Sequence, residues 1–246
     1  MPNDTTTTSP LALPAPTTVP DVITRLADIQ TWIEATSRRG DRDGVACFNF
    51  LYHVITCRVL EWIDDGRFAD AEFLTTLDLV FAGRYLDALR AHDADPATAP
   101  RSWAALFENR DESDIDPMQF AAAGVNAHVN FDLPCAVLTT CEQLGREPGF
   151  GTQRADYDKV NEIFAVKMED LRQHFQSDFE RLLDELLFRH VQNILGNFSV
   201  EAARDTAWTQ AGVLWALRDN AGAQQGLIQS IDKFAGLAGR GLMVHL

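Results

Sequence analysis

Hydrophobic residues recur at steps of three and four along nearly the whole chain, which is the spacing of one face of an α-helix. An early example is the stripe formed by Val22, Leu26, Ile29 and Ile33. No segment alternates apolar and polar residues over the length of a strand, which is the pattern of a half-buried sheet. The sequence therefore predicts an all-α fold.

Glycine, proline and acidic residues divide this pattern into a helical bundle of about seven to eight helices, one long and one kinked at a proline. Asp21 is the expected N-cap of the first helix, and Phe68 lies near the start of the third. The other expected helices cover residues 43–63, 100–107, 117–144, 157–195, 200–217 and 227–237.

Residues 1–20 differ in composition from the rest of the chain. They contain six Thr and five Pro and lack the basic start and apolar core of a secretory signal. Such a segment has little apolar surface to bury. We expect a disordered leader over residues 1–20, followed by a single all-α domain over residues 21–246, a length that fits one large domain.

The charge balance limits the classes of partner. Lys and Arg number 21 and Asp and Glu number 36, so the formal net charge is −15. A field of this sign repels phosphate backbones, so we expect no nucleic-acid partner. The apolar runs are far shorter than the roughly 20 residues that a membrane helix needs, so we expect no membrane insertion.

The four cysteines, Cys47, Cys57, Cys135 and Cys141, all lie in apolar stretches, and no two form a C-x-x-C pair. Free cysteine in such a setting behaves as a small buried hydrophobic residue. We interpret them as reduced thiols in a cytoplasmic protein.

The segment Gly124–Pro134 concentrates polar residues within an apolar, Ala-rich stretch. His128 and Asp132 are four apart, so both project from the same face of a helix. An imidazole and a carboxylate so placed can bind a divalent metal ion, or can form a general base oriented by the acid. The same spacing also occurs in purely structural bridges.

Pro134 follows this pair directly. It has no N–H to close the helical hydrogen bond, so the expected kink falls on the segment that contains His128 and Asp132. Asn126 and Asn130 lie in the same segment, and burying them would be costly without a purpose. We expect both to bind substrate.

A second polar cluster spans residues 154–161, at the start of the long helix. Asp156 or Asp158 is expected to cap that helix. Asp158 and Asn161 could instead complete a polar site that faces His128.

These motifs resemble a bacterial family catalogued as DUF5995, a domain of unknown function. The resemblance rests mainly on G-x-N-A-H-x-N-x-D-L-P at Gly124–Pro134 and D-x-D-x-V-N at Asp156–Asn161, with weaker agreement at Ala207–Ala211 and Gly239–Leu242. It spans about Phe48 to the C-terminus. The family carries no known reaction, so the resemblance implies a shared site without naming its chemistry.

Two functions follow. The first is an enzyme that acts on a small, largely apolar substrate in a pocket between helices, with His128 as base or metal ligand and Asp132 as its orienting partner or co-ligand. With a divalent metal the reaction would be hydrolysis, and with no cofactor it would be acid–base isomerisation or cyclisation. The alternative is a non-catalytic helical binding or scaffolding protein whose polar cluster fixes the packing. Whether the chain forms a homodimer stays open.

Overall fold

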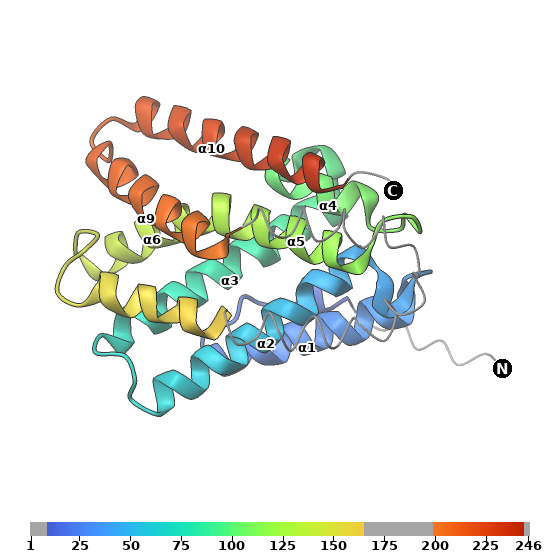
Figure 1. Ribbon diagram of the computed structural model, residues 1–246, viewed down its shortest axis with the longest axis horizontal. Coiled ribbons are helices and arrows are strands. Elements are labelled where there is room, and N and C mark those ends of the chain that lie inside the picture. Colours follow the sequence, from blue (N-terminus) through green and yellow to red (C-terminus); the bar gives the residue numbers. More distant parts are fainter. Residues whose placement is uncertain (1–8, 165–198, 244–246) are drawn as a thin grey trace.

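The computed structural model describes residues 9–164 and 199–243, and within these ranges every regular element is helical (Figure 1). The all-α fold is confirmed. The main helices are α1 (Val19–Thr36), α2 (Gly44–Asp64), α3 (Ala71–Ala94), α4 (Arg101–Asn109), α5 (Pro117–Ala127), α6 (Leu133–Leu144), a helix over residues 153–164, α9 (Val200–Ala216) and α10 (Ala221–Leu242). The rest of the long helix expected over residues 157–195 lies outside the described residues.

The rod formed by α5 and α6 occupies the middle of the bundle (Figure 1). Helices α2 and α10 pack against α5, and α3 and α9 pack against α6. The largest fully buried side chains around this rod are aromatic and include Phe48, Tyr85, Trp103 and Phe120. Polar groups on the inward faces of the rod, such as His128 and Asp132, are therefore buried near aromatic rings.

Helix α1 begins earlier than expected, and its N-cap is Thr18 instead of Asp21. The Thr18 hydroxyl accepts the N–H of Asp21 at 3.2 Å, and the Asp21 carboxylate accepts the N–H of Thr18 at 3.0 Å. This reciprocal pair is a capping box, in which the acid occupies the third helical position.

The expectation of a disordered leader over residues 1–20 is wrong for residues 9–20. Pro10–Ala12 forms a 3₁₀ turn, and Leu11 is buried. Arg90 Nε donates to the Leu11 carbonyl at 2.9 Å, and Arg25 Nη2 donates to the Pro14 carbonyl at 2.8 Å. These bonds to backbone carbonyls fix a segment whose composition alone offers little to pack.

The irregularity expected at Pro134 is present, but it is a π-turn over His128–Asp132. The Leu133 N–H donates to the His128 carbonyl, five residues back, and Pro134 then stands in the first turn of α6. A proline is tolerated there because first-turn N–H groups have no partner within the helix. Turns of this kind occur frequently at functional sites.

None of the helices in residues 9–164 and 199–243 has the length and apolar character of a membrane span. All four cysteines are unpaired, and Cys47, Cys135 and Cys141 are buried.

Gly124 allows α5 to approach α2 closely. A Cβ atom at this position would lie 2.6 Å from the Cβ of Phe48 and closer still to its ring. Gly83 on α3 provides a contrast, since a Cβ there would meet no atom within 4 Å.

We therefore expect Gly124→Ala to lower the free energy of unfolding by about 1–3 kcal/mol, the usual cost of overpacking a core. Gly83→Ala should raise it by about 0.5–1 kcal/mol, because alanine is the better helix former. Urea unfolding of both variants measures the difference. Equal effects of the two substitutions would show that α5 and α2 are not in close contact.

Candidate functional site

His128 and Asp132 lie together inside the bundle, as the sequence predicts. The Nδ1 atom of His128 is 3.0 Å from Oδ2 of Asp132, and the two residues are only 3% and 1% exposed. The pair is therefore cut off from bulk water, where its hydrogen bond is stronger than at a surface.

Asp132 is held by donors from two further helices. Trp103 on α4 donates its Nε1–H to Oδ2 at 2.9 Å, and Arg84 on α3 donates its Nε–H to Oδ1 at 3.3 Å. Hydrogen bonds from a cation and an indole fix this carboxylate in position. His128 must then present its proton on Nδ1, which leaves a lone pair on Nε2.

Several effects act on the pKa of His128. Burial lowers it, the hydrogen bond and charge of Asp132 act in the opposite direction, and the charge of Arg84 lowers it again. The net result is a pKa below the ordinary value of 6.5. The imidazole is neutral at pH 7, which is the form that can accept a proton.

Aromatic rings fix the plane of the imidazole. Phe81 stacks on it with ring centroids 3.4 Å apart and planes only 7° from parallel. Tyr52 meets it edge-on at 4.6 Å. The ring is thus clamped between α2 and α3, and its Nε2 atom cannot swing towards another partner.

A cavity of about 60 Å³ lies beside His128. Most of its wall is apolar and comes from α2 and α3, and Val160 and Phe164 also contribute to it. The polar or charged side chains in the wall are His128, Tyr52, Thr56, Asp78 and Arg204.

Three buried polar atoms of this wall have no hydrogen-bond partner among the described residues: Nε2 of His128, the hydroxyl of Tyr52 and Oδ2 of Asp78. A buried polar group without a partner costs roughly 1–3 kcal/mol. Three such atoms around one cavity indicate that water or a ligand supplies the missing hydrogen bonds.

Sequence reasoning missed Asp78 and Tyr52. Asp78 occupies an inward position of α3, one turn after Leu74, and is 8% exposed. Burial raises the pKa of its carboxyl to about 7. The available signal for Asp78 was an acidic residue within an otherwise apolar stripe of a helix. The helix that packs against this stripe could not be identified from the sequence.

Asn126 and Asn130 do not lie in the wall of this cavity. Asn126 donates to the Ala235 carbonyl of α10 at 2.8 Å and accepts from Asn130 at 3.0 Å. The two amides join the central rod to α10. Their placement supports a packing role and not the substrate contact that we expected.

Asp158 and Asn161, both in the helix over residues 153–164, differ in their relation to the cavity. Asp158 pairs with Arg154 at 2.8 Å and is half-exposed. Asn161 accepts the Nε–H of Arg204 at 2.7 Å, and Arg204 lines the cavity. Asn161 is therefore linked to the site through Arg204, whereas Asp158 does not line the cavity.

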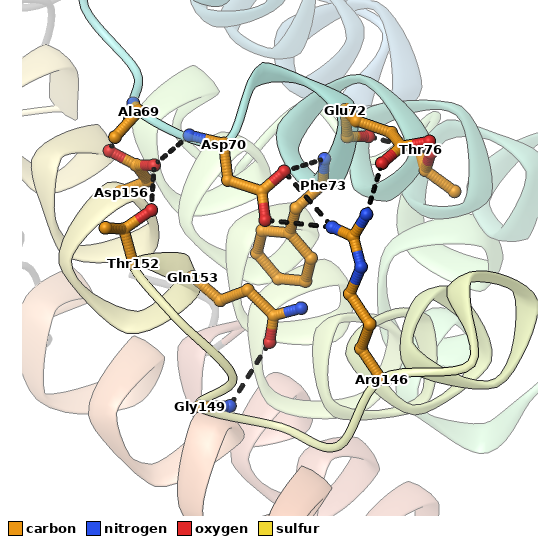
Figure 2. Close-up of polar contacts among 10 residues, drawn as sticks. All are labelled: Ala69, Asp70, Glu72, Phe73, Thr76, Arg146, Gly149, Thr152, Gln153 and Asp156. Atoms are coloured by element: carbon orange, nitrogen blue, oxygen red, sulfur yellow. Dashed lines mark hydrogen bonds and ion pairs between the residues drawn. The ribbon is translucent and has the colours of Figure 1, made fainter.

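Asp156, which we expected as a possible cap of its own helix, holds the start of α3 instead (Figure 2). Its carboxylate accepts the N–H groups of Ala69 at 3.1 Å and Asp70 at 2.7 Å. Arg146 adds ion pairs to Asp70 at 3.1 Å and Glu72 at 2.5 Å. These contacts join the α2–α3 connection to the rest of the bundle, so we assign this cluster a structural role.

The geometry does not suit His128 and Asp132 as joint ligands of one metal ion. The two side chains bond to each other, and both oxygens of Asp132 accept further donors. In the described parts of the chain no three or more His, Cys, Asp or Glu residues are grouped as metal ligands.

A model of a family described as "Family of unknown function (DUF5995)" matches residues 19–245. The chain belongs to this family. The DUF5995 match begins at the first residue of α1, well before Phe48, where the resemblance seen in the sequence starts. No curated protein and no solved structure matches the chain. The chemistry of this DUF5995 protein must therefore be argued from its own geometry.

The burial of Asp78 can be tested through the pH dependence of the free energy of unfolding. Its folded-state pKa of about 7 lies above the ordinary value of 3.8, so the folded state holds the proton more tightly and loses stability as pH rises between these values. From about pH 5 to pH 8, the wild type should lose about 3 kcal/mol through this group. Asp78→Asn should remove that loss in urea unfolding at the two pH values.

Asp28→Asn, which removes an exposed carboxylate from α1, is the control for the change in net charge. The same pH dependence in wild type and Asp78→Asn would show that Asp78 is not buried as described.

Proposed function

We propose that this DUF5995 protein is an enzyme that moves protons on a small, largely apolar molecule bound in the cavity beside His128. The observation that carries the proposal is the bare Nε2 atom of a buried, neutral imidazole whose other nitrogen is held by Asp132. A lone pair fixed in direction and shielded from water is the arrangement that a general base needs.

In the proposed reaction, Nε2 of His128 accepts a proton from a C–H or O–H group of the substrate. The imidazole becomes cationic, and the adjacent Asp132 carboxylate stabilises that charge. Arg84 and Trp103 hold the Asp132 carboxylate in place, so that it orients the base.

Asp78 would supply the complementary proton. With a pKa of about 7, its carboxyl is partly protonated at neutral pH. One proton leaves the substrate for His128, and one passes from Asp78 to another atom of the substrate. The enzyme returns to its starting state when the proton on His128 is transferred through solvent to Asp78, so protons and charge balance over one turnover.

A reaction that removes one proton from the substrate and returns another is an isomerisation or a cyclisation. We therefore favour these reactions over the metal-dependent hydrolysis that the sequence left open. A hydrolase in which His128 and Asp132 both bind one metal ion is disfavoured, because the two residues bond to each other. The cavity of about 60 Å³ has room for about four water molecules, so the part of the substrate it receives is small.

A non-catalytic binding role is the second candidate. It is favoured by an apolar surface on α10, where Phe234 is 71% and Leu237 55% exposed. Exposed apolar side chains of this size suit a protein partner, including a second copy of the chain.

The unpaired cysteines are compatible with a location in the cytoplasm, which we retain as part of the proposal.

Solvent-deuterium exchange tests the catalytic role. The protein in D₂O is offered a panel of small apolar carbonyl compounds and unsaturated acids, and NMR follows the loss of C–H signals. We expect exchange at one position of at least one compound, and we expect His128→Gln to slow it by about 100-fold or more.

His53→Gln is the matched control, because His53 is a half-buried histidine of α2 that does not line the cavity. Exchange by the wild type that is no faster than by a folded His128→Gln variant, for every compound, would contradict the proposal. Far-UV circular dichroism establishes that each variant is folded.

A further inference from the structure

Arg204 of α9 extends into the interior and is only 4% exposed. Its Nε–H bonds to Asn161 Oδ1 at 2.7 Å, and Nη2 bonds to the Tyr157 carbonyl at 2.7 Å. The guanidinium also lies over the rings of Tyr157 and Phe164, at 4.1 Å and 5.8 Å. These contacts fix the group in the wall of the cavity that contains His128.

The positive charge of Arg204 has no ion-pair partner within residues 9–164 and 199–243. Asp158 and Asp205 are close enough to influence it, but both form ion pairs with Arg154. The hydrogen bonds to Arg204 come from a neutral amide and a backbone carbonyl, and Nη1 donates to no described residue. Buried charges in proteins are normally paired, so this one lacks an anion.

Asp78, the carboxylic acid among the residues that line the cavity, is not that anion. It forms no ion pair with Arg204 in the described structure, and the pKa of its carboxyl is raised by burial alone. A neighbouring guanidinium would act in the opposite direction. Arg204 thus adds a cation to the cavity wall that also contains His128 and Asp78.

We propose that Arg204 binds the carboxylate of the ligand, so that the substrate is a short, apolar carboxylic acid whose reactive carbon lies towards His128. The inference rests on the proposed function, because it names the substrate class of the same cavity. A planar guanidinium matches the two oxygens of a carboxylate. Bulkier phosphate would leave oxygens without donors, since the remaining wall is mostly apolar.

Isothermal titration of the full chain with matched pairs of small molecules tests this directly. Butanoate is compared with butanamide, and hexanoate with hexanamide, because each pair has nearly the same shape and differs in charge. We expect the wild type to bind one carboxylate at least about tenfold more tightly than its amide, the effect of one charged hydrogen bond. This comparison needs no variant and cannot be confused with misfolding.

Arg204→Gln should abolish the preference, and Arg204→Lys should retain part of it. Arg218→Gln, a change at an exposed arginine that does not line the cavity, should leave it intact. Equal binding of acid and amide, no saturable binding of either up to about 10 mM, or a preference that survives in Arg204→Gln would each overturn the inference.

The two proposals fail in different ways. A carboxylate preference that depends on Arg204, without deuterium exchange, contradicts the acid–base role and leaves the ligand class standing. Exchange that depends on His128 but occurs equally on acids and amides contradicts the role of Arg204 alone.

Discussion

The Asp132 carboxylate is the group on which the interior of this protein depends. It accepts hydrogen bonds from Arg84 of α3, Trp103 of α4 and His128 of the π-turn, so a single side chain joins three parts of the bundle. A buried carboxylate is costly unless donors surround it, and here they do. The same contacts determine which nitrogen of His128 carries the proton, so one interaction serves both packing and proposed chemistry.

The cavity beside this pair works against stability. Tyr52, Asp78 and Nε2 of His128 are buried without partners among the described residues, and Asp78 is ionised at a cost at alkaline pH. A core optimised only for packing would replace such groups with apolar ones. Their presence within one small cavity is most simply explained by a ligand that completes their hydrogen bonds.

The helices could be predicted from the sequence because a three- to four-residue period is a local signal, and Gly145 ends α6 in the expected left-handed conformation. The pairing of His128 with Asp132 is equally local. Asn126 and Asn130, which we grouped with this pair, do not line the same cavity, and the reason is geometric. Residues two positions apart are separated by about 200° around a helix. The pair His128 and Asp132 and the pair Asn126 and Asn130 therefore face opposite sides of the rod. Asp78 and Arg204 could not be found, since only the packing of α3 and α9 brings them to one cavity.

The ionisation state of His128 tests the account most directly. Nitrogen NMR of the ¹⁵N-labelled protein, with the signal assigned by comparison with His128→Gln, reports which ring nitrogen carries a proton between about pH 7 and pH 8. We expect a neutral ring across this range, with the proton on Nδ1 and a bare Nε2. A proton on Nε2 at pH 7, in either the other neutral form or the cation, would contradict it.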